Sequence, residues 1–266
     1  MIPLDYLSVA RFQGPDAGDF LQAQLSADIA ALEPGESTFA CYCTPRGQVI
    51  GLLLVCRQHD GYLVASATEL LPRILTRFKM FVLRSRVEFT AQAGITVYGI
   101  GPQVDIADPG VFQPDGFPMA YLFRENTGET DVSSERFKVL EISNRVTWLG
   151  PETAEKFIPQ MLGFDQIGAV SYTKGCYPGQ EIVARTRYLG KVKRKPVVVQ
   201  LQEELQIRPA ERVELRRENG WSGGTVIDSV PGKEAGMLFF IVASGEPETG
   251  PAELKYQDQS YRCATI

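Results

Sequence analysis

The chain has 266 residues, of which 44% are hydrophobic and 22% charged, an ordinary balance for a globular protein with one large or two to three small domains. Its net charge of −5 argues against non-specific nucleic-acid binding by the whole surface. The sequence holds no apolar run of the ~18 residues that span a bilayer, no signal-peptide pattern and no disulfide framework among its five scattered cysteines. We therefore expect a cytoplasmic protein without membrane contact.

The first two thirds of the chain mix strand and helix patterns. Helices are expected from Asp16 to about Ile29, over 70–81 and over 151–158. Strands are expected at 6–12, 38–43, 48–56, 62–66, 84–90, 95–100, 119–124 and 139–142. The only histidine, His59, falls in a hairpin turn before Asp60-Gly61. With one histidine, in a turn, Ser-His-Asp and Cys-His catalysis are excluded unless His59 is itself the catalytic histidine.

After about Gly190 no helical period remains. Six strand patterns follow, at 192–201, 212–216, 225–230, 237–242, 252–256 and 261–266. A run of short strands without helices is typical of a small barrel. We therefore expect an α+β fold with two domains, residues 1–189 and a β-barrel over 190–266.

The stretch Lys174-Gly175-Cys176-Tyr177-Pro178-Gly179-Gln180-Glu181, called the octet below, concentrates a thiol, an amine, an amide and a carboxylate just before this junction. Lys174 can lower the pKa of a nearby thiol, so Cys176 is the candidate reactive thiol and Lys174 its candidate partner. A Gly-Pro turn around a small buried cysteine is the alternative. A lone thiol cannot hold an iron–sulfur cluster, and we expect no stably bound metal.

A basic stretch follows the octet without any acidic residue. It contains Arg185, Arg187, Lys191, Lys193, Arg194 and Lys195. Two interpretations stay open: a solvated strand face, or an anion site for a polyglutamate tail or an RNA backbone.

The octet resembles the K-G-C-Y-x-G-Q-E signature of YgfZ-type folate-binding proteins, relatives of the glycine-cleavage T-protein. Further similarity to that family lies at 20–28, 43–48, 157–160, 168–172 and 182–185. The resemblance implies an aminomethyltransferase-like fold, with two ferredoxin-like subdomains followed by the barrel. It also implies tetrahydrofolate or a derivative as ligand.

The folate-site residues that the resemblance implies come from three parts of the chain. They are Tyr6, Leu7, Phe137, Gly175, Tyr177, Gly179, Gln180, Glu181 and Arg185. The chain departs from the family pattern at Asn144-Arg145, where a glycine turn is usual. An arginine there narrows the pocket or supplies an anion contact.

The resemblance implies an accessory role for iron–sulfur enzymes, and thereby in tRNA modification, with folate, iron–sulfur proteins and tRNA as candidate partners. The stretch 49–53 lacks the carboxylate that the T-protein uses, so a classical transferase is not expected. An active folate-dependent aminomethyl transferase and a tRNA-binding module remain the alternatives.

Overall fold

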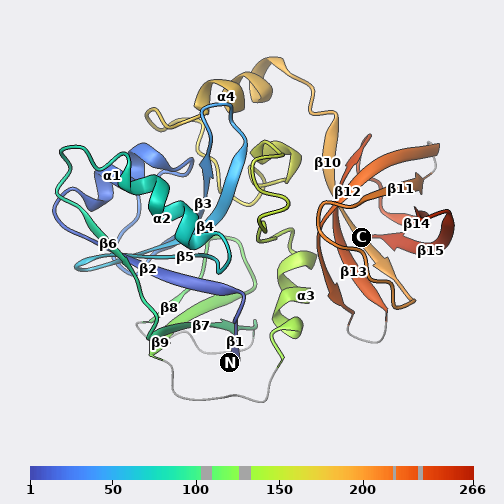
Figure 1. Ribbon diagram of the computed structural model, residues 1–266, viewed down its shortest axis with the longest axis horizontal. Helices are drawn as coiled ribbons and strands as arrows, with labels where there is room; N and C mark the ends of the chain where they lie inside the picture. Colours follow the sequence, from blue (N-terminus) through green and yellow to red (C-terminus); the bar gives the residue numbers. More distant parts are fainter. Residues whose placement is uncertain (103–109, 126–132, 218–219, 233–235) are drawn as a thin grey trace.

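A computed structural model describes residues 1–102, 110–125, 133–217, 220–232 and 236–266. Figure 1 shows a part built of sheets and helices beside a β-barrel, with helix α3 (Glu135–Ser143) between them. Of the helices that the structure describes, none is both long and apolar enough to cross a membrane.

The larger sheet has five strands in the order β3-β4-β5-β2-β6. Their bounds are Ser37–Cys43, Val49–Gln58, Gly61–Ala67, Leu7–Gln13 and Glu88–Ala91. Helices α1 (Ala17–Gln24) and α2 (Leu71–Lys79) pack against it through Phe20 and Phe78, whose ring centroids lie 5.7 Å apart. The first eight residues of β4 are all buried, which explains their unbroken apolar run.

The smaller sheet has the order β1-β7-β9-β8. Its strands are Ile2–Pro3, Ile95–Ile100, Ala120–Glu125 and Val111–Phe112. It packs against the larger sheet, because the rings of Phe39 on β3 and Tyr121 on β9 meet edge to face at 6.1 Å. The two sheets and their helices form the two ferredoxin-like subdomains that the family resemblance implies.

The six strands predicted after residue 190 close into a barrel of order β10-β13-β12-β11-β14-β15. They span Arg194–Leu201, Met237–Ser244, Gly220–Pro231, Arg212–Arg217, Gly250–Tyr256 and Gln259–Thr265. Strand β13 is apolar on both faces. Phe239, Ile241 and Ala243 fill the barrel, whereas Leu238, Phe240 and Val242 join the core of the preceding part. The barrel is thus docked through its own buried outer face.

Two predicted elements around residues 139–158 are wrong. The expected strand at 139–142 belongs to α3, because an apolar run this short fits either structure and packing decides. The expected helix at 151–158 is a series of turns. Glu155 has a φ of 59° and donates its backbone N–H to Val49, which blocks helical pairing there.

Two helices also differ from the sequence prediction. The first helix stops at Gln24 and not near Ile29, because Leu25 is extended and the amides of Ile29 and Ala30 bond to the side chain of Gln22. Helix α4 (Gln180–Leu189), which the sequence patterns did not predict, begins inside the octet.

Candidate functional site

The octet is held against a hairpin turn more than 130 residues away. Gly179 caps α4 with a φ of 84°, and a Cβ there would lie 2.5 Å from the carbonyl oxygen of Thr44 and 2.6 Å from the Cα of Gly47. Gly47 likewise approaches Ile182 closely. Only glycine allows two backbones to come this near, so Gly179 is required by packing.

Lys174 serves the fold. Its ammonium is buried and donates to the backbone carbonyls of Gln22, Leu25 (2.7 Å) and Ala27 (2.9 Å), and it lies 5.5 Å from the ring of Tyr177. Burial lowers the pKa of Lys174 to about 8, so the group is still mainly protonated at neutral pH. All three N–H groups of the Lys174 ammonium bind backbone carbonyls, so none is left to donate to the Cys176 thiol.

Cys176 differs from the other thiols in its exposure. Cys41, Cys43 and Cys56 are buried, and Cys263 is half-buried with a pKa that burial raises to about 11. The octet therefore presents its thiol to solvent, which rules out the alternative of a small buried cysteine. The described residues contain no cluster of three or more His, Cys, Asp or Glu side chains arranged for a metal.

The remaining polar residues of the octet do not converge on a ligand. The Gln180 amide contacts the carbonyl of Lys174 at 3.4 Å, and the exposed Glu181 pairs with Arg185 at 3.0 Å. Tyr177 is buried. The octet thus combines structural groups with one exposed thiol.

A cavity of about 450 Å³ lies where the larger sheet, α3 and the barrel meet. Tyr6, Trp148 and Ile227 give it apolar walls, and charged groups reach it from several elements: Glu69, Lys138, Glu152 and Asp228. Of the residues predicted to bind folate, only Tyr6 lines it. Leu7 is buried in β2, and Phe137 is a core residue whose ring covers Gly99 and meets Tyr121 at 5.4 Å.

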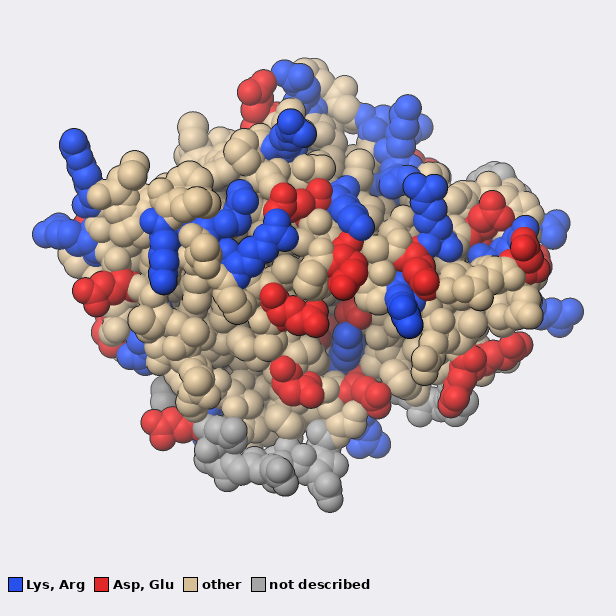
Figure 2. Space-filling view, in the orientation of Figure 1, with Lys and Arg blue, Asp and Glu red and all other residues tan. Residues whose placement is uncertain are grey.

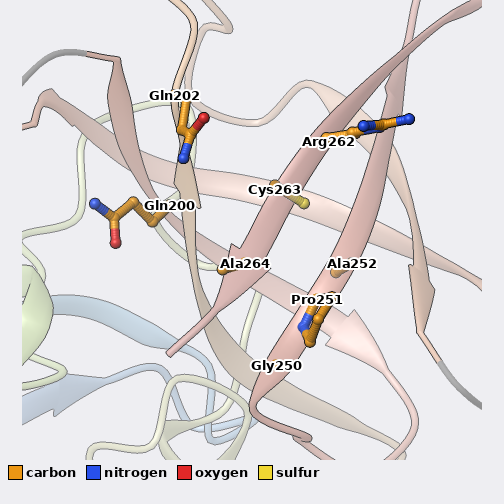
Figure 3. Close-up of a pocket in the computed structure, with 8 residues that line it drawn as sticks. All are labelled: Gln200, Gln202, Gly250, Pro251, Ala252, Arg262, Cys263 and Ala264. Atoms are coloured by element: carbon orange, nitrogen blue, oxygen red, sulfur yellow. The ribbon is translucent and has the colours of Figure 1, made fainter.

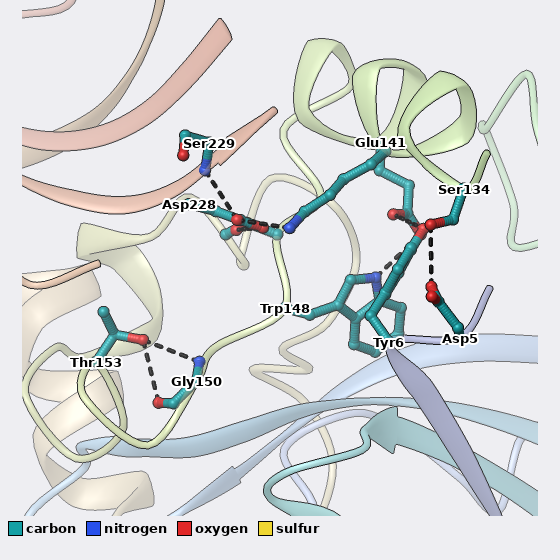
Figure 4. A network of polar contacts seen from close by, with 11 residues as sticks. Asp5, Tyr6, Ser134, Glu141, Trp148, Gly150, Thr153, Asp228 and Ser229 are labelled. Atoms are coloured by element: carbon teal, nitrogen blue, oxygen red, sulfur yellow. Dashed lines mark hydrogen bonds and ion pairs between the residues drawn. The ribbon is translucent and has the colours of Figure 1, made fainter. Parts of the chain in front are cut away.

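Glu141 holds the aromatic wall of this cavity in place. It is 1% exposed and accepts hydrogen bonds from Tyr6 Oη (2.6 Å), Trp148 Nε1 (2.9 Å) and Tyr121 Oη (2.9 Å), the first two visible in Figure 4. Burial raises the pKa of Glu141 to about 7, and these three hydrogen bonds limit the rise. Tyr6 and Trp148 are therefore fixed before any ligand arrives.

An ion pair ties the cavity to the barrel. Lys138, one turn before Glu141 on α3, lies 2.7 Å from the carboxylate of Asp228 on β12, which also accepts the amide N–H of Ser229 at 2.8 Å. Asp228 follows a bulge in the pairing of β12 with β13. Burial raises the pKa of Asp228 and the ammonium of Lys138 counteracts it.

Sequence reasoning missed Glu141, Trp148 and Asp228. None belongs to a motif. A usable signal existed in two cases, because Glu141 and Asp228 are single acids inside apolar runs, and a buried acid must find donors or a cation.

A larger hollow, of about 630 Å³, lies on the outside of the barrel where β10, β14 and β15 meet (Figure 3). Small side chains such as Ala252 and Ala264 form most of its wall, and Arg262 is its one charged group among the described lining residues. The smaller central cavity is the better candidate site, because it joins fixed aromatic rings to buried charges.

Replacing Gly179 by alanine should destabilise the protein by about 2–4 kcal/mol, because a side chain in the left-handed region is strained and this Cβ meets backbone atoms. Gly175→Ala, four residues earlier in the octet, is the matched control: nothing lies within 4 Å of its Cβ. We expect it to change stability by less than about 0.5 kcal/mol. Urea unfolding measures both, and equal losses would contradict this packing role.

Glu141 should make stability fall as the pH rises from 4.5 to 7. In that window the folded state keeps a proton that the unfolded state has released, which gives a total loss of about 3 kcal/mol. Glu141→Gln is close in shape and does not titrate, so this part of the slope should vanish. The test is urea unfolding at several pH values, with Glu181→Gln on the surface as control. Parallel curves for the wild type and Glu141→Gln would refute the assignment.

Comparisons with known proteins agree with this architecture, although no family model matches the sequence. The chain is 26% identical over 281 residues to the tRNA-modifying protein YgfZ of Klebsiella pneumoniae (strain 342), covering 93% of this chain and 86% of that protein. It is 25% identical over 281 residues to the tRNA-modifying protein YgfZ of Edwardsiella ictaluri (strain 93-146), covering 91% and 83%.

A solved structure shows the same fold. The glycine cleavage system aminomethyltransferase T from Bartonella henselae aligns with a TM-score of 0.68, covering 99% of this chain and 83% of that chain at 14% sequence identity. The chain is thus a sequence relative of YgfZ-type proteins and has the fold of the glycine-cleavage T-protein.

Proposed function

We propose that this protein binds tetrahydrofolate, or a derivative, in the central cavity and acts as an accessory factor in tRNA modification by supporting iron–sulfur enzymes. One observation supports the folate site above all. Tyr6 and Trp148 line a cavity of suitable size and are fixed from behind by the buried carboxylate of Glu141. Such pre-ordered aromatic walls are what a flat pterin ring requires.

The residues present fit a reduced pterin. The volume of about 450 Å³ lies within the ~300–1,000 Å³ usual for small-molecule sites. Carboxylates at the cavity, Glu69 and Glu152, can accept hydrogen bonds from the amino and ring N–H groups of the pterin. The same negative charge disfavours the carboxylates of the glutamate tail, so we place the tail toward solvent.

The role in tRNA modification is drawn from the names of the relatives, tRNA-modifying proteins that match over most of their length. The link to iron–sulfur enzymes is drawn from the family resemblance of the octet. The exposed Cys176 supports that link chemically, because an accessible thiol can form a transient bond to iron or a mixed disulfide with a partner.

Aminomethyl transfer is not part of the proposal. Residues 49–53 are buried in β4 and include no carboxylate. Asp228 does bring a carboxylate to the cavity, but its Oδ1 already binds Lys138 and the amide of Ser229, and its Oδ2 accepts the Thr147 hydroxyl at 3.4 Å. Ammonia release from an aminomethylated carrier protein would be the observation that restores the transferase alternative.

Tetrahydrofolate should quench the fluorescence of Trp148. The chain has two tryptophans, and Trp221 is 46% exposed on the barrel, so Trp221→Phe leaves Trp148 as the only reporter. We expect saturable quenching in this variant, after correction for absorption by the folate. The matched control is Trp148→Phe, in which Trp221 should not respond. Equal responses, or no heat of binding by calorimetry at millimolar folate, would overturn the folate site.

Cys176→Ala should fold normally and yet fail to restore tRNA methylthiolation in a deletion strain. The thiol is exposed, so its loss should cost less than about 0.5 kcal/mol of stability, and any defect is then chemical. Cys263→Ala, which removes the half-buried thiol, is the control and should restore the modification. Full rescue by Cys176→Ala would make the thiol dispensable.

A further inference from the structure

A second surface, away from the cavity, combines positive charge with exposed aromatic rings. The chain has no acidic residue between positions 182 and 202, although its net charge is −5. Figure 2 shows Lys and Arg side chains gathered along the upper edge, over α4 and the connection to the barrel. We call this the α4 face and define it by Arg185, Arg187, Tyr188, Lys191 and Lys193, all of which are exposed.

The aromatic part of the α4 face is ordered by its neighbours. The Arg187 guanidinium lies 5.0 Å from the centre of the Tyr172 ring, and the rings of Tyr172 and Tyr188 meet edge to face at 6.2 Å. Tyr188 is nevertheless 67% exposed, and the adjacent Leu189 is 86% exposed. The fold therefore contacts one edge of the Tyr188 ring and leaves the rest of the ring in water, where a flat group can stack on it.

The positive charge of this face is only weakly neutralised. Arg185 pairs with the exposed Glu181 at 3.0 Å, and Arg187 lies 4.0 Å from Asp165. The first pair is exposed on both sides and contributes little, and the second is at the distance limit of a salt bridge. Lys191 and Lys193 form no salt bridge with any residue that the structure describes. Lys195 and, to a lesser extent, Lys191 lower the pKa of the Glu246 carboxyl, so Lys191 has one acidic neighbour. A polyanion would meet two exposed ammonium groups without a salt bridge, three and five residues along the chain from the exposed ring.

We propose that the α4 face binds an unpaired segment of RNA, with a base stacked on Tyr188 and phosphates on Lys191 and Lys193. This rests on the proposed role in tRNA modification and assigns that role a contact surface. An acidic protein would satisfy the lysines but does not require an oriented, exposed aromatic ring. A nucleic-acid base has a π-face that stacks on such a ring, and stacking favours single strands over duplexes.

The test is fluorescence anisotropy with a labelled ten-nucleotide single-stranded RNA and with an unmodified tRNA transcript. Removing two phosphate contacts in Lys191→Gln/Lys193→Gln should weaken binding and reduce the slope of log K against log salt by about 1.4. Tyr188→Ala should weaken binding about fivefold or more, whereas Tyr188→Phe, which keeps the ring, should retain it. All these positions are exposed, so melting temperatures should not change.

The matched control is Lys79→Gln/Arg84→Gln, which removes the same charge beside the exposed Met80 and Leu83 after α2 and should leave RNA binding unaltered. Absence of binding at 50 mM salt would overturn the proposal. So would a polyglutamate peptide that binds as tightly as RNA and is indifferent to Tyr188→Ala, because the face would then be a general anion site. Folate quenching of Trp148 is measured in the same preparations, so failure of RNA binding and failure of the folate site are told apart.

Discussion

The buried carboxylate of Glu141 is the constraint on which the centre of this protein depends. A charge removed from water is tolerated only when donors surround it. Its three donors come from separate elements: Tyr6 before β2, Tyr121 on β9, and Trp148 after α3. Satisfying one acid therefore fixes the first residues of the chain, the smaller sheet and the loop after α3 relative to each other. Two of the three donors, Tyr6 and Trp148, line the cavity, so the same hydrogen bonds fix its aromatic wall.

Helix α3, which carries Glu141, also fixes the position of the barrel. Lys138 lies one turn before Glu141 and pairs with Asp228 at the bulge of β12, while the apolar outer face of β13 packs into the main core. The ion pair alone would be a poor source of stability, since both groups lose hydration. The apolar contact supplies the affinity of the two parts for each other, and the ion pair fixes the position of a charge at the cavity wall.

The octet separates into two kinds of residue. Lys174, Tyr177 and Gly179 are used by the fold: an ammonium that binds three carbonyls, a buried ring, and a glycine that lets α4 start against the turn at Gly47. Cys176 is what this framework exposes. Most of the functional groups in the octet are therefore structural and hold one exposed thiol in place. The thiol and the cavity can act as separate sites.

Much of the architecture follows from the sequence. Apolar periodicity and turn signals predicted the barrel strands, the hairpin at His59 and a helix over 70–81, which the structure forms at Leu71–Lys79, because these patterns report which face of an element is buried. Only the tertiary structure decided that residues 139–142 are helical, that Lys174 binds backbone carbonyls, and that Glu141, Trp148 and Asp228 meet at one cavity. Local patterns indicate which residues are buried, whereas the partner of a buried charge is set by how separate segments pack, as for Glu141 with Tyr6 and Lys174 with Leu25.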